Sequence, residues 1–207
     1  GRILVGFSVL FTGMMMMGES VEPLKDSPSF SHILTAFNNP LVGVLAGAVI
    51  TAVIQSSAAS IGILQSLSIT GHITYGMAIP IIMGQNIGTC VTALISSIGV
   101  NRSARRVAVI HIAFNCIGTI ILLPILYLVN AFVDFVFMDW TISYAGIALV
   151  HTIFNVVVTF LLLPFSKLLE KLAYLVIKQL PEETQKEQLI LPGEILLNTP
   201  AVAIEAC

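Results

Sequence analysis

Five long apolar stretches divide the chain, and each is followed by a short polar or charged segment. A helix of about 20 apolar residues spans the hydrocarbon core of a bilayer, so stretches of this length predict helices that cross or enter a membrane. The stretches cover residues 3–17, 41–69, 73–99, 107–130 and 141–165. The pattern predicts an all-α integral membrane protein.

The composition agrees with this pattern. Of the 207 residues, 57% are hydrophobic and only 10% are charged, whereas soluble domains average about 25% charged residues. The net charge is −2, and no basic stripe with interleaved aromatic residues predicts nucleic-acid binding. The three cysteines lack metal-binding spacing, and no G-x-S-x-G motif predicts a hydrolytic nucleophile. We therefore expect no enzyme, no catalytic residues, no transition metal and no organic cofactor.

Basic residues predict the orientation of the spans. Arginines precede the fourth stretch and lysines follow the fifth, at positions 102, 105, 106, 167, 171 and 178. Residues 131–140, which join these stretches, contain neither residue type. Because cytoplasmic flanks carry the excess of lysine and arginine, both basic clusters are expected inside and the joining loop outside.

The second stretch is predicted to enter the membrane and return. With Arg2 inside, the first stretch ends outside; the third must also start outside in order to end inside at Arg102. As one helix, residues 41–69 would be about 40 Å long, more than the hydrocarbon core of about 30 Å. Its midpoint is Gln55, so a re-entrant hairpin would place Gln55 at the tip. A strongly tilted single helix is the alternative.

Two polar groups interrupt the apolar stretches. One is Gln55-Ser56-Ser57, and the other is the run GQNIGTC at residues 84–90, which predicts a broken helix. Uncharged oxygens at membrane depth suit a hard cation, and half-helix ends add favourable dipoles. Such side chains also join helices by hydrogen bonds in membranes. Before any resemblance is considered, an ion or solute site and helix packing both remain open.

A short repeat links the fourth and fifth stretches. HIAFNCIGTIILLPI at 111–125 aligns without gaps on HTIFNVVVTFLLLPF at 151–165. The pairs His111/Asn115 and His151/Asn155 have helical spacing, so each pair shares one helix face. Packing and a proton or substrate role are both compatible with this pattern.

These motifs carry a family resemblance. VITAVIQSSAASIGIL, AIPIIMGQNIGTCVTALISSIG and HIAFN together resemble the bacterial branch of the sodium/phosphate cotransporter type II family over roughly residues 3–165. That family has a Gln-Ser-Ser motif in each of two inverted repeats, and this chain contains one. The resemblance therefore implies the second inverted repeat, one half of an inverted-repeat transporter, with a re-entrant helical hairpin and a broken helix.

The resemblance also implies roles for particular residues. Those implied to bind sodium are Gln55, Ser56, Gln85, Asn86, Thr89 and Thr92. Ser56 and Ser57 are implied to bind phosphate. The chain departs from the family pattern at Ala58, Ser60 and Cys90, and Gln85 stands where some members have serine.

The function implied is sodium-coupled symport of inorganic phosphate in the bacterial inner membrane, with sodium co-transported. Residues 1–178 would form the transport repeat, and residues 179–207 a cytoplasmic linker and the start of a PhoU-like helical domain. The expected partners are phosphate, sodium, the bilayer and a missing first repeat, and a homodimer is also considered. Transport of another small anion and a non-transporting regulator of phosphate signalling are the alternatives.

Overall fold

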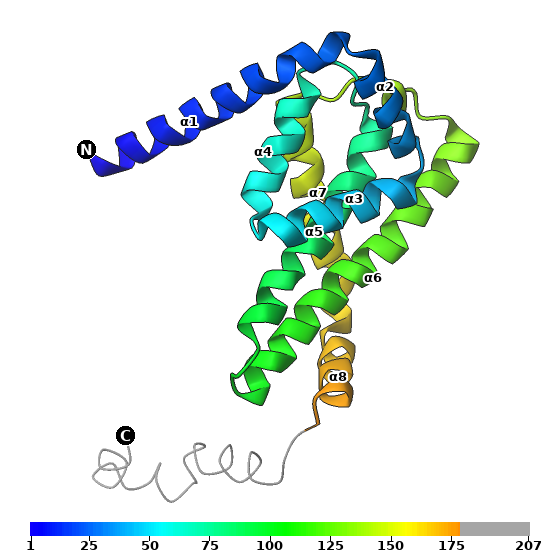
Figure 1. Ribbon diagram of the computed structural model, residues 1–207. Helices are drawn as coiled ribbons and strands as arrows, with labels where there is room; N and C mark the ends of the chain where they lie inside the picture. Colours follow the sequence, from blue (N-terminus) through cyan, green and yellow to red (C-terminus); the bar gives the residue numbers. More distant parts are fainter. Residues whose placement is uncertain (179–207) are drawn as a thin grey trace, which may run out of the picture.

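The structure is a computed structural model in which residues 1–178 are described. The expected linker and PhoU-like segment at 179–207 lies outside the described residues. Helices account for almost all of the described chain (Figure 1). The α-helices are α1 (Arg2–Val21), α2 (Pro28–Leu34), α3 (Pro40–Ile54), α4 (Ser57–Ser68), α5 (Tyr75–Ser96), α6 (Arg102–Val133), α7 (Tyr144–Leu162) and α8 (Ser166–Val176). Short 3-10 helices are η1 (Glu22–Asp26), η2 (Thr35–Asn38), η3 (Val136–Asp139) and η4 (Leu163–Phe165).

Four helices within residues 1–178 are long and apolar enough to cross a membrane, or five if one bent pair counts as a span. They begin at Arg2, Tyr75, Arg102 and Tyr144. The prediction of an all-α membrane protein is confirmed. The polar segment between the first two apolar stretches contains α2 and its flanking 3-10 helices.

Helix starts follow local capping chemistry. The side chains of Asn39, Thr74, Asn101 and Ser143 accept hydrogen bonds from backbone N–H groups in the first turns of α3, α5, α6 and α7. Such caps satisfy donors that have no partner within the helix. The start of each of these helices is therefore determined by a capping residue close to it in the sequence.

The second apolar stretch divides at Gln55, as predicted. Gln55 is left-handed, with φ 58° and ψ 21°, and ends α3; Ser56 is extended and caps α4 by accepting from the Ala59 N–H. With 15 and 12 residues, each arm is shorter than the about 20 residues needed to span a membrane. Figure 1 shows α3 and α4 meeting at an open angle.

Glycines bring α3 and α5 into close contact where the two helices cross. A Cβ built on Gly43 would lie 3.0 Å from the Cβ of Pro80, and one on Gly88 would lie 2.8 Å from the Cβ of Thr51. Between them, Gly84 faces the carbonyl of Val44. Residues early in α3 contact residues early in α5, and residues late in α3 contact residues late in α5. The two helices therefore run in the same general direction, and α4 returns toward the start of α5. This arrangement supports an enter-and-return hairpin.

The predicted break at residues 84–90 is wrong, because α5 continues as one helix from Tyr75 to Ser96. Polar side chains in this run donate hydrogen bonds to backbone carbonyls of α5 itself, and the helix continues through them. Asn86 Nδ2 donates to the carbonyl of Ile82 at 2.9 Å, and Thr89 Oγ1 donates to that of Gln85 at 2.9 Å. Gly84 and Gly88 serve close approach to α3 instead of bending α5.

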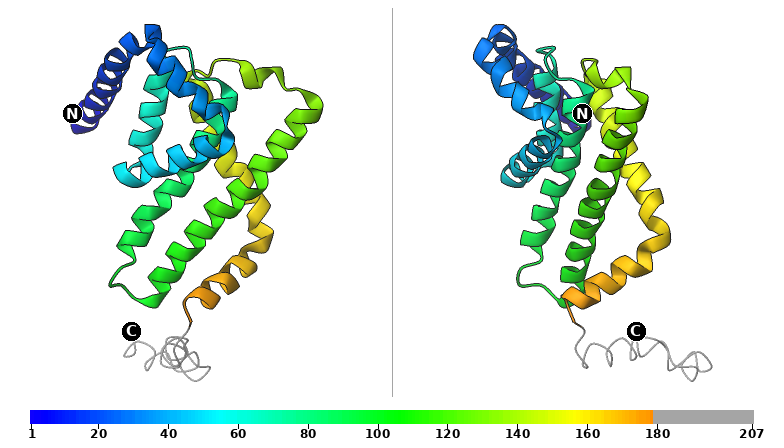
Figure 2. Two further views of the ribbon diagram at one scale, coloured as in Figure 1. Left: turned by 45° about the vertical axis from the view of Figure 1, so that its right-hand side comes forward. Right: turned by 90° about the vertical axis from the view of Figure 1, so that its right-hand side faces the viewer.

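The two ends of the bundle match the predicted charge pattern. At one end, the start of α5 meets the loop after α6: Ile142 N–H donates to the carbonyl of Ile73 at 2.9 Å, and Tyr75 N–H to that of Trp140 at 3.0 Å. At the other end, Arg102 Nη1 donates to the carbonyl of Lys178 at 2.7 Å. Both basic clusters therefore lie at one end, as Figure 2 also shows.

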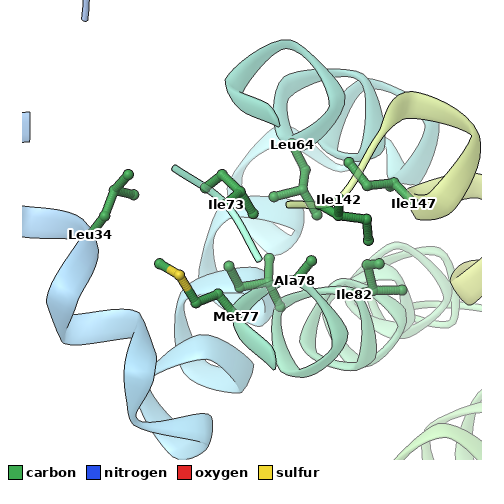
Figure 3. Packing of buried hydrophobic residues seen from close by; sticks show 9 residues of the cluster. Leu34, Leu64, Ile73, Met77, Ala78, Ile82, Ile142 and Ile147 are labelled. Carbon is green, nitrogen blue, oxygen red and sulfur yellow. The ribbon is translucent and has the colours of Figure 1, made fainter. Parts of the chain in front are cut away.

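Two apolar clusters hold the bundle together. The first joins α4, α5 and the start of α7 around Ile73, Ile82 and Ile147, all nearly inaccessible to solvent (Figure 3). The second joins α5, α6, α7 and α8 around Phe154 and Val158. Helix α5 contributes to both clusters and is the central element on which the other helices pack.

Candidate functional site

The Gln-Ser-Ser group forms the tip of the hairpin. Gln55 is exposed, whereas Ser56 and Ser57 are half-buried. The Gln55 N–H donates to the carbonyl of Thr51 at 2.7 Å and closes the end of α3. A non-glycine residue in the left-handed region carries a conformational cost, and such residues concentrate at functional sites. The tip therefore presents an amide and two hydroxyls at the junction of two half-length helices.

One turn behind the tip, a buried network joins both arms to α5. Thr51 Oγ1 on α3 donates to Ser60 Oγ on α4 at 2.7 Å. Gln85 Nε2 on α5 donates to Ser60 Oγ at 2.9 Å and to the Ser60 carbonyl at 3.0 Å. Thr51 and Ser60 have no exposed surface. These bonds fix the hairpin against α5 at the depth of Gln85.

The other polar atom of the Gln85 side chain has no partner. Gln85 is 3% exposed, and its Oε1 lacks a hydrogen bond among the described residues. A buried acceptor without a partner costs about 1–3 kcal/mol. Gln85 and Ser60 also line a cavity of about 60 Å³ whose other walls are mainly apolar. The lining surface of this cavity is almost entirely apolar, so it is the missing hydrogen bond of Gln85 Oε1 that makes this oxygen a candidate ligand atom.

Asn86 belongs to a second polar network on another side of α5. Its Oδ1 accepts from Nδ2 of Asn155 on α7 at 3.3 Å. One turn further on, the Cys90 sulfur accepts from Nδ2 of Asn115 on α6 at 3.4 Å. The asparagines of the two repeated motifs thus contact successive turns of α5. Each asparagine also donates to the carbonyl of its paired histidine, His111 or His151, four residues earlier.

Thr89 and Thr92 have hydroxyls that donate within α5. The Thr89 hydroxyl donates to the Gln85 carbonyl at 2.9 Å, and the Thr92 hydroxyl to the Thr89 carbonyl at 2.7 Å. Both side chains are half-buried. Because each hydroxyl uses its hydrogen in the helix, its oxygen lone pairs stay available to a cation or to another donor.

The structure brings together only part of the predicted set. Gln85 contacts the hairpin arms, whereas Asn86 contacts α7. Gln55 and Ser57 make no side-chain hydrogen bond to α5 among the described residues. Thr51 and Ser60 were missed as network members, although each lies one helical turn from the Gln-Ser-Ser group. Thr51 lies four residues before Gln55 and Ser60 four residues after Ser56, and this helical spacing could have indicated that they belong to the same site.

Removing the Ser60 hydroxyl is expected to loosen the hairpin. Ser60→Ala leaves the Thr51 hydroxyl without its acceptor and takes one of two acceptors from Gln85 Nε2, so stability should fall by about 1–3 kcal/mol. Thermal unfolding of the purified protein in detergent measures this. The matched control is Ser68→Ala in the same helix, because within residues 1–178 the Ser68 hydroxyl donates to the local carbonyl of Gln65 and to no other helix. Equal stability of the two variants would contradict the network.

Comparison with known proteins adds a family match. The model of the Na+/Pi-cotransporter family matches residues 9–158. The uncharacterized protein YqeW of Bacillus subtilis (strain 168) is 32% identical over 65% of this chain and 44% of its own length. YjbB of Escherichia coli (strain K12), named for inorganic phosphate export, is 26% identical over 62% of this chain and 24% of its own.

A human protein also matches part of this chain. Sodium-dependent phosphate transport protein 2B of Homo sapiens is 33% identical over 59% of this chain and 19% of its own length. The chain therefore spans less than half the length of these relatives. No solved structure matches.

Proposed function

The chain belongs to the Na+/Pi-cotransporter family, and on this premise we propose that it forms one half of a sodium-coupled symporter of inorganic phosphate in a bacterial inner membrane. The observation that carries the proposal is the partnerless Oε1 of Gln85, buried behind the tip at Gln55. An uncharged buried oxygen beside a helix junction suits a hard monovalent cation. The phosphate names of two relatives support the choice of anion.

In this proposal, sodium is held by side-chain oxygens of Gln55, Ser56, Gln85, Asn86, Thr89 and Thr92. These residues line two faces of α5 and the tip, so they would serve more than one ion. Phosphate is placed at the start of α4, beside Ser56 and Ser57. The unpaired N–H groups of a helix N-terminus and two hydroxyls can hold an oxyanion there without a buried arginine.

The single hairpin leaves these sites incomplete. The cavity beside Gln85 has only two polar lining residues, Ser60 and Gln85, whereas a bound ion needs more oxygens than these residues offer. A second Gln-Ser-Ser hairpin from a first inverted repeat would supply the rest. The greater length of the relatives is compatible with such a repeat.

The test is uptake of labelled phosphate by proteoliposomes that contain the intact protein, with and without an inward sodium gradient. Uptake should require sodium, and Gln55→Ala should raise the sodium concentration for half-maximal uptake several-fold. Gln55 is exposed, so the variant should keep its thermal stability. Uptake and sodium dependence unchanged in Gln55→Ala would remove Gln55 from the site.

The same assay separates the alternatives. Stronger inhibition by another oxyanion or a dicarboxylate than by unlabelled phosphate would indicate a different small-anion substrate. Phosphate movement that ignores the sodium gradient would contradict symport. Absence of any transport, with phosphate signalling intact in cells that express a Gln55→Ala/Thr89→Ala variant, would favour a regulator.

A further inference from the structure

The last candidate membrane span runs over 33 residues from Tyr144 to Val176, and its final part is the short helix α8. Helix α7 has 19 residues, which corresponds to about 28 Å and already matches the hydrocarbon core of about 30 Å. After η4, the 11 residues of α8 therefore extend beyond the core. In the right-hand view of Figure 2, α8 turns away from the line of α7 and passes toward the start of α6.

One face of α8 is fixed to the basic end of the bundle. Leu169 and Ala173 are buried on this face. The guanidinium of Arg106 lies 4.5 Å from the centre of the Tyr174 ring, and its Nε donates to the carbonyl of Ile177 at 3.0 Å. These contacts set the rotation of α8 about its axis, and so they determine which side chains point away from the bundle.

An apolar stripe remains exposed next to the buried face. Leu168, Leu172 and Leu175 recur at spacings of four and three residues, which places them on one side of the helix. They are 63%, 36% and 72% exposed. Exposing a stripe of leucines to water is unfavourable. The helix that contains this stripe, α8, follows directly after α7 and η4. The hydrocarbon edge of the same bilayer is the apolar phase nearest to it.

Lysines occupy the adjoining side of the helix. Lys167 and Lys171 are one turn apart, Lys178 follows the end of the helix, and all three are exposed. Exposed Arg105 adds a charge from the start of α6. The single acidic residue of α8 is Glu170. A basic face beside an apolar stripe is the arrangement of helices that lie in the membrane interface.

We propose that α8 is an interfacial helix that binds the anionic lipid headgroups of the bilayer through Lys167, Lys171 and Lys178, with the leucine stripe of 168, 172 and 175 inserted at the acyl boundary. Two observations favour anionic lipid as the partner of α8: the positive charge of the lysines complements anionic headgroups, and α8 directly follows the membrane-spanning helix α7. Basic residues beside a membrane span attract anionic lipid over about one Debye length. The proposal depends on the membrane placement of α7 and is independent of transport.

Tryptophan quenching by brominated lipids tests the proposal on the intact protein. The 207 residues contain one tryptophan, Trp140, so the reporter is Leu175→Trp in a background in which Trp140 and every tryptophan elsewhere in the full-length protein are replaced by phenylalanine. The protein is reconstituted in phosphatidylcholine vesicles that contain brominated phosphatidylglycerol or brominated phosphatidylcholine. At about 0.1 M salt, the anionic lipid should quench at least about threefold more effectively per mole, and this preference should disappear near 1 M salt, where screening shortens the Debye length to about 3 Å.

Matched variants separate charge from simple lipid contact. Replacing the three lysines by glutamine should abolish the preference, replacing them by arginine should keep it, and Glu170→Gln should increase it. A control protein that keeps Trp140 as its one tryptophan should show no preference, because the loop of Trp140, residues 131–140, contains no lysine or arginine. Absence of quenching by either lipid would place α8 against protein and overturn the proposal. Equal quenching by both lipids at low salt would overturn the anionic preference.

Discussion

Gln85→Met is expected to abolish most sodium-dependent phosphate uptake while leaving a folded protein. Methionine preserves the length and helix propensity of the side chain but removes both amide atoms. The change eliminates the donor to Ser60 and the buried oxygen that we assign to sodium. Losing an ion-ligand oxygen, like a hydrogen bond to a charged group, costs about 1.5–3 kcal/mol, which corresponds to about 10- to 150-fold in sodium affinity.

The measurement is the sodium dependence of phosphate uptake, taken together with thermal stability. Gln65→Met is the matched control, because Gln65 Nε2 also donates to a carbonyl on another helix, that of Tyr144 at 3.1 Å, but lies outside the Gln85 network. We expect the control to keep its sodium dependence. A Gln85→Met protein that loses stability but keeps the wild-type sodium concentration for half-maximal uptake would show that Gln85 only supports the fold.

Gly84→Ala is expected to separate α3 from α5 and to destabilise the protein by about 3 kcal/mol or more. A Cβ at position 84 would collide with the backbone carbonyl group of Val44, and its distance to the Val44 Cα would be 2.8 Å. Backbone atoms cannot relieve a clash by changing rotamer, so the cost should reach the upper part of the range for overpacking. The hairpin would shift relative to Gln85, and transport should fall as well.

Thermal unfolding and phosphate uptake together measure this effect. Gly62→Ala is the matched control in the same hairpin, because nothing lies within 4 Å of a Cβ built at position 62. Alanine is the better helix former by about 1 kcal/mol, so the control should be as stable as the wild type or more so. If Gly84→Ala behaved like the control, the close approach of α3 and α5 would be refuted.

Local chemistry explains why the hairpin was predictable. The stretch at 41–69 is too long for an untilted span, its midpoint is Gln55, and the next residue, Ser56, is of a type that caps helix starts. The charge pattern likewise predicted that α6 and α7 return the chain to one end, and the bond from Arg102 to the carbonyl of Lys178 confirms it. Which end faces the cytoplasm stays a prediction.

The run at 84–90 shows the limit of such reasoning. Glycines and polar residues in an apolar stretch are equally typical of a helix break and of a tight helix crossing. The choice depends on a partner helix more than 30 positions earlier, whose Val44 and Ala48 carbonyls approach the glycines of α5. Local patterns contain no information about that partner, so the predicted break was wrong.

The sequence by itself determined the membrane class, the spans, the hairpin junction and the family, because hydrophobic length, capping and motif spacing are properties of neighbouring residues. The tertiary structure alone decided that Gln85 faces the hairpin while Asn86 faces α7, and that Asn115 and Asn155 meet α5. It also decided which faces of α8 remain exposed. Adjacent positions on a helix point about 100° apart, so their partners depend on how whole helices pack.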